Sequence, residues 1–204
     1  MRVHELHAAS VHAPLVLLPT AAAVDLVAVV TGNRSQAGLG RALWLIGAAG
    51  GVVAGLAGAA ASQEVRADDS RTEDMIWLHG VGNAALLVGA LGIAAWRSQR
   101  GPSVLVSVLG LTASAASLYT AYLGGEMVYG RGVGIGSMPR YLDTGVRNSP
   151  PVLSKRALST FFRDAVAGFV WLFRRSKEAA QGVRPVSREA FGLPARELAP
   201  HNNV

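Results

Sequence analysis

The chain has 204 residues, of which 50% are hydrophobic and only 16% are charged, whereas an average soluble domain carries about 25% charged residues. It contains no cysteine, which excludes disulfides, thiolate metal sites, iron–sulfur clusters and haem attached through cysteine. Twelve of its nineteen Lys and Arg residues lie in 124–204. The sequence therefore divides into an apolar body, 1–123, and a basic tail that can bind anionic lipid headgroups. The tail carries no nucleic-acid-binding motif, so nucleic acid is not expected as a partner.

Four apolar stretches are long enough to cross the hydrocarbon core of a bilayer, which takes about 20 helical residues. They are 8–30, 42–61, 75–96 and 104–123. Backbone polar groups in lipid must be paired within a segment, so the stretches are expected to be α-helices. Because the connectors between them are short, neighbouring helices should run antiparallel. The sequence predicts an all-α protein with an up-down-up-down membrane bundle and both termini on one side.

The first stretch carries one acidic residue, Asp25. It lies thirteen residues after His12, or about 20 Å further along a helix that rises about 1.5 Å per residue. Asp25 therefore approaches the membrane face opposite to His12. We expect it to form a structural ion pair there with Arg34 or Arg41, since an unpaired charge in lipid is costly.

A row of glycines follows the second stretch at four-residue spacing: Gly47, Gly51 and Gly55. This spacing places them on one helix face with almost no side chain, which favours close packing against a neighbouring helix. The alternative is that the face around Gly51 and Gly55 leaves room for a flat cofactor such as a porphyrin.

Histidines mark one end of the predicted bundle. His12 lies about one turn inside the first helix and His79 about one turn inside the third, and alternate helices enter the membrane from the same side. Asn83 lies one turn deeper than His79 on the same face. His7 and Glu126, which follows the fourth helix, are expected at the same end. Topology alone therefore gathers these five residues into one neighbourhood.

Several ligands suit such a group. His12 and His79 could be the axial ligands of one b-type haem, with Asn83 nearby. A divalent metal ion could instead be held by His7, His12, His79 and Glu126, or the group could hydrogen-bond a quinone headgroup. If it binds nothing, the polar cluster only holds the helices together, and the imidazoles should bond to Glu126, Asn83 or backbone carbonyl groups.

The basic tail, 124–204, contains one amphipathic segment. Apolar residues recur at helical spacing over 157–173, and basic residues follow. The segment is too short and too interrupted by charge to span a bilayer. We therefore expect a helix that lies at the membrane interface or docks on a partner, within an otherwise partly irregular tail.

Three motifs resemble a widespread bacterial family of small four-helix membrane proteins, domain of unknown function 2231. They are His7 and His12 followed by Ala13-Pro14-Leu15, His79 with Asn83, and Leu123-Gly124-Gly125-Glu126-Met127-Val128-Tyr129-Gly130. The resemblance implies a four-helix membrane fold and a cytochrome-b-like or redox-associated role, with no established reaction. The basic tail departs from the family pattern.

No Ser-His-Asp, paired-carboxylate or nucleotide-binding arrangement is visible in the sequence, so an enzyme is not expected. The leading hypothesis is a non-catalytic accessory subunit of a larger, energy-transducing membrane complex, which its tail would contact. The alternative is a small b-type cytochrome or quinone-linked electron carrier that uses His12 and His79. We expect a multi-pass protein of the bacterial inner membrane. Both termini should be cytoplasmic, because the anionic cytoplasmic leaflet attracts the basic tail.

Overall fold

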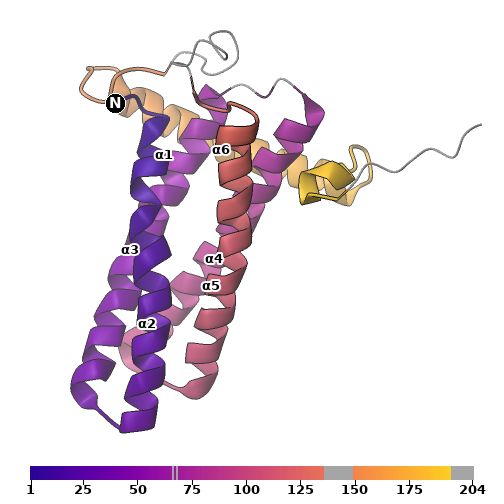
Figure 1. The fold of residues 1–204 in the computed structure, drawn as a ribbon. Coiled ribbons are helices and arrows are strands. Elements are labelled where there is room, and N and C mark those ends of the chain that lie inside the picture. The colour runs from indigo at the N-terminus through magenta and orange to yellow at the C-terminus, as the bar shows by residue number, and fades with distance from the viewer. Residues whose placement is uncertain (66, 68, 136–148, 194–204) are drawn as a thin grey trace, which may run out of the picture.

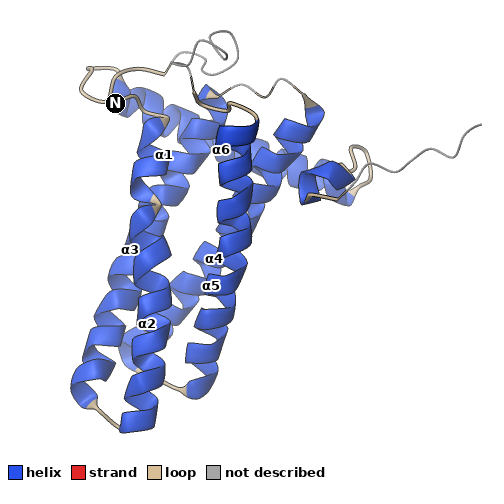
Figure 2. Cartoon of the chain, in the orientation of Figure 1, coloured by secondary structure: helices blue, strands red, loops and turns tan. Residues whose placement is uncertain are grey.

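The structure, a computed structural model, describes all residues except 66, 68, 136–148 and 194–204. The described chain is almost entirely helical (Figures 1 and 2). In chain order its elements are α1 (Glu5–Ser10), α2 (His12–Thr31), α3 (Arg34–Glu64), α4 (Ser70–Gln99), α5 (Val104–Gly125), the π-helix η1 (Glu126–Gly130), α6 (Ala157–Ala180) and the 3-10 helix η3 (Arg188–Phe191).

Four helical segments of the described chain are long and apolar enough to cross a membrane. They are Glu5–Thr31, which joins α1 and α2, then Arg34–Glu64, Ser70–Gln99, and Val104–Gly130, which joins α5 and η1. The all-α class and the four predicted membrane helices are thereby confirmed. Every segment is longer than its apolar stretch, because the helix continues into the residues at the ends of the stretch.

The connection between the first two membrane segments shows why the helices are longer than predicted. Residues 31–41 were expected to form a connector, but only two residues separate α2 from α3. Gly32 ends α2 with φ 64°, a conformation that glycine adopts without strain. Asn33 Oδ1 then accepts hydrogen bonds from the amides of Ser35 at 2.9 Å and Gln36 at 3.2 Å. This N-cap supplies an acceptor for amides of the first helical turn that have no acceptor within the helix. α3 therefore begins directly after Asn33.

The four membrane segments form a ring of antiparallel neighbours. α2 contacts α3 and α5, and α4 also contacts α3 and α5. The N-terminus and α6 lie at the same end of this bundle (Figure 1), which we call the near end. The opposite end, with the α2–α3 and α4–α5 connections, is the far end. Small residues fill the core of the far half around one large side chain: Ala21, Ala22, Trp44, Ala48 and Ala94.

The glycine row of α3 packs against its neighbours, as the sequence predicted. A Cβ atom on Gly47 would lie 2.8 Å from Leu18 of α2, and one on Gly51 would lie 2.9 Å from Leu87 of α4. One on Gly55 would lie 3.3 Å from the same leucine. Glycine therefore lets two neighbouring helices approach α3 closely on this face.

The amphipathic segment of the tail forms α6, which continues seven residues beyond the predicted 157–173. It runs across the long axis of the bundle near its upper end (orange in Figure 1) and contacts α3 and α4. Gly168 makes the closest approach, because a Cβ atom at that position would lie 2.1 Å from the carbonyl oxygen of Ala59. The described part of the tail is thus folded onto the bundle.

Candidate functional site

Two histidines meet inside the near end of the bundle. His7 lies on α1 and His79 on α4, and the centroids of their rings are 5.9 Å apart with an interplanar angle of 88°. Neither ring is exposed. The sequence predicted equal depth for His12 and His79, with His7 only at the same end, whereas the structure brings His7 against His79.

Each imidazole is fixed by a hydrogen bond to a backbone carbonyl. His7 Nδ1 lies 3.0 Å from the oxygen of Ala54, and His79 Nδ1 lies 2.8 Å from the oxygen of Thr120. A carbonyl oxygen can only accept, so the proton of a neutral imidazole is assigned to Nδ1 in both rings. The Nε2 atom of each ring then carries a lone pair, and no side chain or backbone group of the described residues donates to it.

Two glycines make room for these rings. A Cβ atom on Gly58 would lie 2.9 Å from His7 Nδ1, and one on Gly124 would lie 3.2 Å from His79 Cε1. Gly58, Ala54 and Thr120 were not predicted from the sequence as parts of the site. Gly58 lies outside the four-residue glycine row, and a carbonyl acceptor leaves no sequence signal, because every residue has one.

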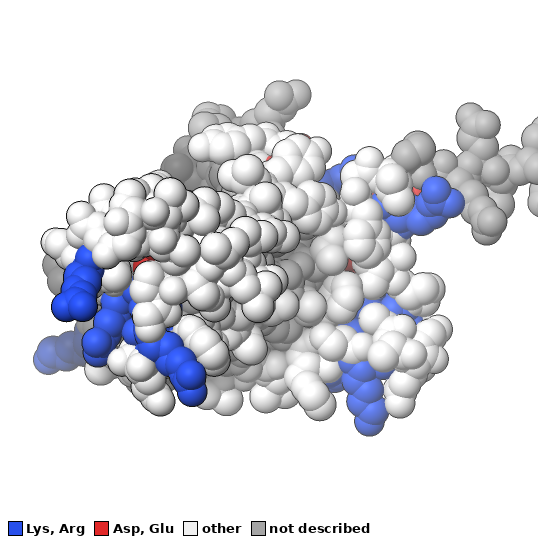
Figure 3. Space-filling view, turned by 90° about the horizontal axis from the view of Figure 1, so that it is seen from below, with Lys and Arg blue, Asp and Glu red and all other residues white. Residues whose placement is uncertain are grey.

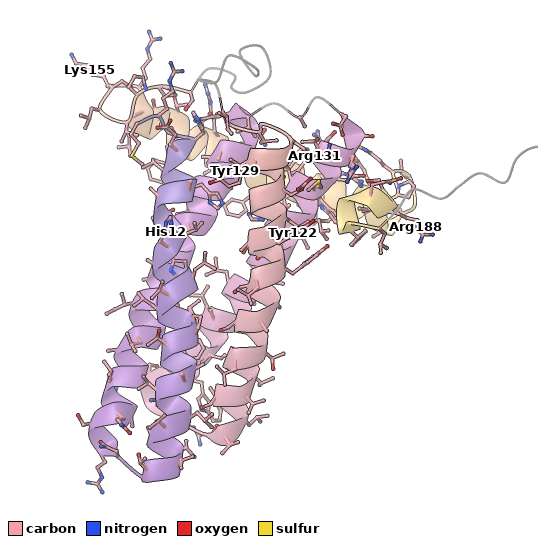
Figure 4. All side chains as sticks on the ribbon, viewed as in Figure 1. His12, Tyr122, Tyr129, Arg131, Lys155 and Arg188 are labelled. Atoms are coloured by element: carbon pink, nitrogen blue, oxygen red, sulfur yellow. The ribbon has the colours of Figure 1, made fainter. Side chains whose placement is uncertain are left out.

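His12 does not join the pair. It is exposed on the flank of the first membrane segment (Figure 4), and its Nδ1 faces the Ala9 oxygen of its own helix at 3.4 Å. Five positions along a helix turn a side chain by about 140° relative to its starting direction. Since His7 points into the bundle, His12 must point away from that position. The predicted pairing of His12 with His79 is therefore corrected to His7 with His79.

Asn83 supports His79 but is itself occupied. Its Nδ2 donates to the His79 oxygen at 2.8 Å, and its Oδ1 accepts from Thr120 Oγ1 at 3.2 Å. Glu126 lies on η1, where its carboxylate faces the backbone of Gly130. Among the residues that the structure describes, no three His, Asp or Glu side chains are arranged to hold a metal ion. The four-residue metal site that was considered is not assembled there.

A cavity of about 590 Å³ lies inside the bundle beside His79. This volume falls within the range of about 300–1,000 Å³ that small-molecule and cofactor sites occupy. Its walls are mostly apolar, and they include Gly51, Gly55 and Asn83 as well as α6 residues such as Gly168. His4 lines it towards the near end, where burial lowers the pKa of that imidazole.

The far end holds a different polar group, centred on Asp25. Arg97 donates to both carboxylate oxygens of Asp25, at 2.6 and 3.0 Å, and Trp44 Nε1 donates to the same carboxylate at 3.0 Å. The two charged side chains are 0% and 2% exposed. The remaining donors of Arg97 reach the backbone oxygens of Ala37, at 2.7 Å, and Arg100. Every polar atom of this group has a partner.

An ion pair of Asp25 was predicted correctly, but its partner was not. Gly40 occupies the face of α3 towards Asp25, so the next residue, Arg41, is turned away by about 100°. Arg41 and Arg34 are both exposed at the far end. Figure 3, a view onto that end, shows basic side chains around its rim and very little acidic surface.

A family model described as predicted membrane protein (DUF2231) matches residues 3–137. The match includes α1 to α5, η1, both histidines of the pair and the Asp25–Arg97 group, and it ends before α6. Searches of curated proteins and of solved structures found no match to the chain.

Proposed function

This chain belongs to the DUF2231 family of predicted membrane proteins, and we propose that its His7–His79 pair binds one b-type haem. The observation that carries the proposal is the pair of Nδ1–carbonyl bonds, at 3.0 and 2.8 Å. Histidines that ligate a metal usually donate their second ring N–H to a backbone carbonyl or carboxylate, which sets the tautomer and the ring orientation. Both rings have this arrangement, and both keep Nε2 available as a ligand.

Haem suits the residues better than a free metal ion. A zinc ion needs about four ligands, of which a catalytic site supplies three from the protein. Only two imidazoles meet here, and no third ligand accompanies them in the described chain. Haem brings four ring nitrogens of its own and needs only axial ligands from the protein. The mostly apolar cavity beside His79 suits a large apolar ring.

The ring separation agrees with this proposal but does not carry it. Metal–imidazole bonds are about 2.0–2.1 Å long, so two imidazoles on opposite sides of one ion have centroids roughly 6 Å apart. The observed 5.9 Å is close to that value. Aromatic rings in direct edge-to-face contact also lie about 4.5–7 Å apart, so the separation fits an empty pair equally well.

A quinone suits the same residues less well. Quinone carbonyl oxygens accept hydrogen bonds and therefore need donors. The donor of each imidazole is used by a backbone carbonyl, and one of the two N–H groups of the Asn83 amide already donates to the His79 oxygen, which leaves one donor. Bound haem would supply one-electron transfer. The chain itself contributes two neutral, oriented imidazoles in a site enclosed by helices.

The test is the visible spectrum of the full chain, purified in mild detergent and titrated with haem. We expect a low-spin spectrum that is lost in His7→Ala and in His79→Ala. His12→Ala is the matched control and should keep it, because His12 lies outside the pair. A correctly folded protein that binds no haem, or a low-spin spectrum that survives in either pair variant, would refute the proposal.

The accessory-subunit hypothesis stays a second proposal, with a narrower basis than the sequence suggested. The buried face of α6 is used within the chain, where Arg175 Nη2 donates to Asp74 of α4 at 2.7 Å. A partner subunit would therefore contact the outward face of α6 or the exposed surface of the bundle. Co-purification of a stoichiometric membrane-protein partner under mild detergent would support this role, and a monodisperse single chain from native membranes would count against it.

A further inference from the structure

We propose that α6 lies in the plane of the membrane surface and binds anionic phospholipid headgroups with its outward side. This inference does not depend on haem. It places the near end, with the N-terminus and α6, at the cytoplasmic leaflet, which carries the anionic lipid that attracts basic segments.

The first evidence for a membrane-surface location is the position of α6 along the axis of the bundle. Gly168 packs on Ala59, five residues before the end of α3, and Leu172 packs on Gly80, ten residues after the start of α4. Both bundle positions fall inside the apolar stretches that the sequence defines, near their near-end limits. Exposed Tyr122 and Tyr129 point outward at the same end (Figure 4), and tyrosine is enriched at membrane–water interfaces. α6 therefore crosses the bundle at the edge of the hydrocarbon.

Polar contacts hold α6 at this depth. Arg175 is 1% exposed. It pairs with Asp74 and donates to the oxygen of Arg184, each at 2.7 Å. Trp77 Nε1 of α4 donates to Ser176 at 3.0 Å. These bonds, together with the close approach at Gly168, fix which side of α6 faces the bundle and which faces outward.

An apolar stripe runs along the outward side. Its members recur at intervals of three or four residues, and the described chain leaves each between 54% and 75% exposed: Leu158, Phe162, Val166, Val170 and Phe173. In water such a stripe would be unfavourable, because its apolar surface would stay hydrated. At the edge of the hydrocarbon the acyl chains cover it, as for other amphipathic interfacial helices.

Basic residues border the stripe and supply the preference for anionic lipid. Residues 155–178 contain six Lys and Arg against two Asp and Glu. Lys155, Arg156 and Lys177 are exposed, and in the described chain none of them forms an ion pair. Lys155 points beyond the end of the bundle (Figure 4), where headgroups would lie. An apolar stripe without basic neighbours would suit any apolar partner. An apolar stripe bordered by basic residues suits an anionic bilayer surface.

The absence of cysteine makes the contact directly measurable. Phe162→Cys in the full chain, labelled with an environment-sensitive fluorophore, should show blue-shifted emission in phosphatidylcholine vesicles that contain phosphatidylglycerol. Lipids brominated on their acyl chains should quench it. Gln181→Cys, just after α6 and exposed, is the matched control and should be quenched by aqueous iodide instead.

Charge is tested in the same labelled protein. Replacing Lys155, Arg156 and Lys177 with Gln should weaken the dependence of emission on phosphatidylglycerol, by roughly fivefold in apparent affinity for each residue removed. The far-end control, with Gln at Arg34, Arg41 and Arg100, should leave it unchanged. If iodide quenches the Phe162→Cys label in vesicles as strongly as the control label, lipid does not cover the stripe and the proposal is wrong. A label protected only when a second protein is present would overturn it in favour of a subunit contact.

Discussion

The two ends of the bundle treat buried polar side chains in opposite ways. At the far end, Asp25, Arg97 and Trp44 satisfy one another and the nearby backbone completely. At the near end, His7 and His79 each use one ring nitrogen and keep the other free, and a cavity lies beside His79. A fully paired buried network specifies and rigidifies a structure, whereas a partly paired one marks a place where a ligand can complete it. The contrast separates a structural group from a candidate site within one membrane domain.

The comparison also shows that a charged residue in the membrane can be assigned a structural or a functional role only when both its position and its partners are known. An ionisable side chain inside a membrane is by default a candidate functional group. Asp25 does not meet that expectation, because it is fully buried and both of its oxygens accept hydrogen bonds from Arg97 or Trp44. Each end should therefore respond differently to substitution, and the following predictions are ordered by the size of that response.

Breaking the far-end pair should have the largest effect. Asp25→Asn leaves the Arg97 charge buried without its counter-ion, and removing one partner of a buried pair costs about 3–5 kcal/mol. Unfolding by SDS in mixed micelles, followed by circular dichroism, measures the loss. The double variant Asp25→Leu/Arg97→Met removes both charges and should recover most of it. If the single variant is as stable as the wild type, the group is not structural.

Removing the anchor of α6 should have the next largest effect, and a local one. Arg175→Ala leaves Asp74 without its buried partner, at a cost of about 3 kcal/mol. Because the pair joins α6 to α4, we expect α6 to detach while the four membrane segments stay folded. Limited proteolysis should then cut within 157–180, and hydrogen exchange should rise there and not in α2 or α3. Unchanged protection of α6 would show that apolar packing alone holds it.

Adding one methyl group at the crossing of α6 and α3 should cost less. Gly168→Ala places a Cβ atom 2.1 Å from the Ala59 oxygen, so the helix must shift, and overpacking of this kind costs about 1–3 kcal/mol. The same proteolysis assay reports it. Gly92→Ala is the control, because no atom lies within 4 Å of the added Cβ. That change should be neutral or slightly stabilising, since alanine favours helix by about 1 kcal/mol over glycine.

The smallest loss of stability is expected from substitutions of the near-end histidines in the protein without haem. His79→Ala removes one hydrogen bond to Thr120, worth about 1 kcal/mol, and His12→Ala should change stability by less than about 0.5 kcal/mol. Added haem at about 100 times its dissociation constant should stabilise the wild type by about 2.7 kcal/mol and leave His79→Ala unaffected. A loss in His79→Ala as large as that of Asp25→Asn would remove the contrast between the two ends.

Helix length and direction predicted which end of the bundle carries the candidate site. They did not predict which side chains face each other there. From the sequence, His7, His79 and Asn83 were expected at one end of the bundle, because alternate helices enter the membrane from the same side. The sequence favoured His12 over His7 as the partner of His79, and the structure reverses that choice. That choice depends on the rotation of α1 about its own axis, and helices turn about 100° per residue.

The sequence by itself determined the four membrane segments, the all-α class and the amphipathic character of α6, because hydrophobic length and periodicity are local properties of a chain. Only the tertiary structure decided which polar groups meet: Arg97 rather than Arg34 or Arg41 with Asp25, His7 rather than His12 with His79, and Arg175 of the tail with Asp74. Each of these pairs joins residues far apart in the chain, on elements whose relative rotation and axial offset are set by packing. Small residues such as Gly40, Gly58 and Gly168 control that packing by where they let a neighbour approach.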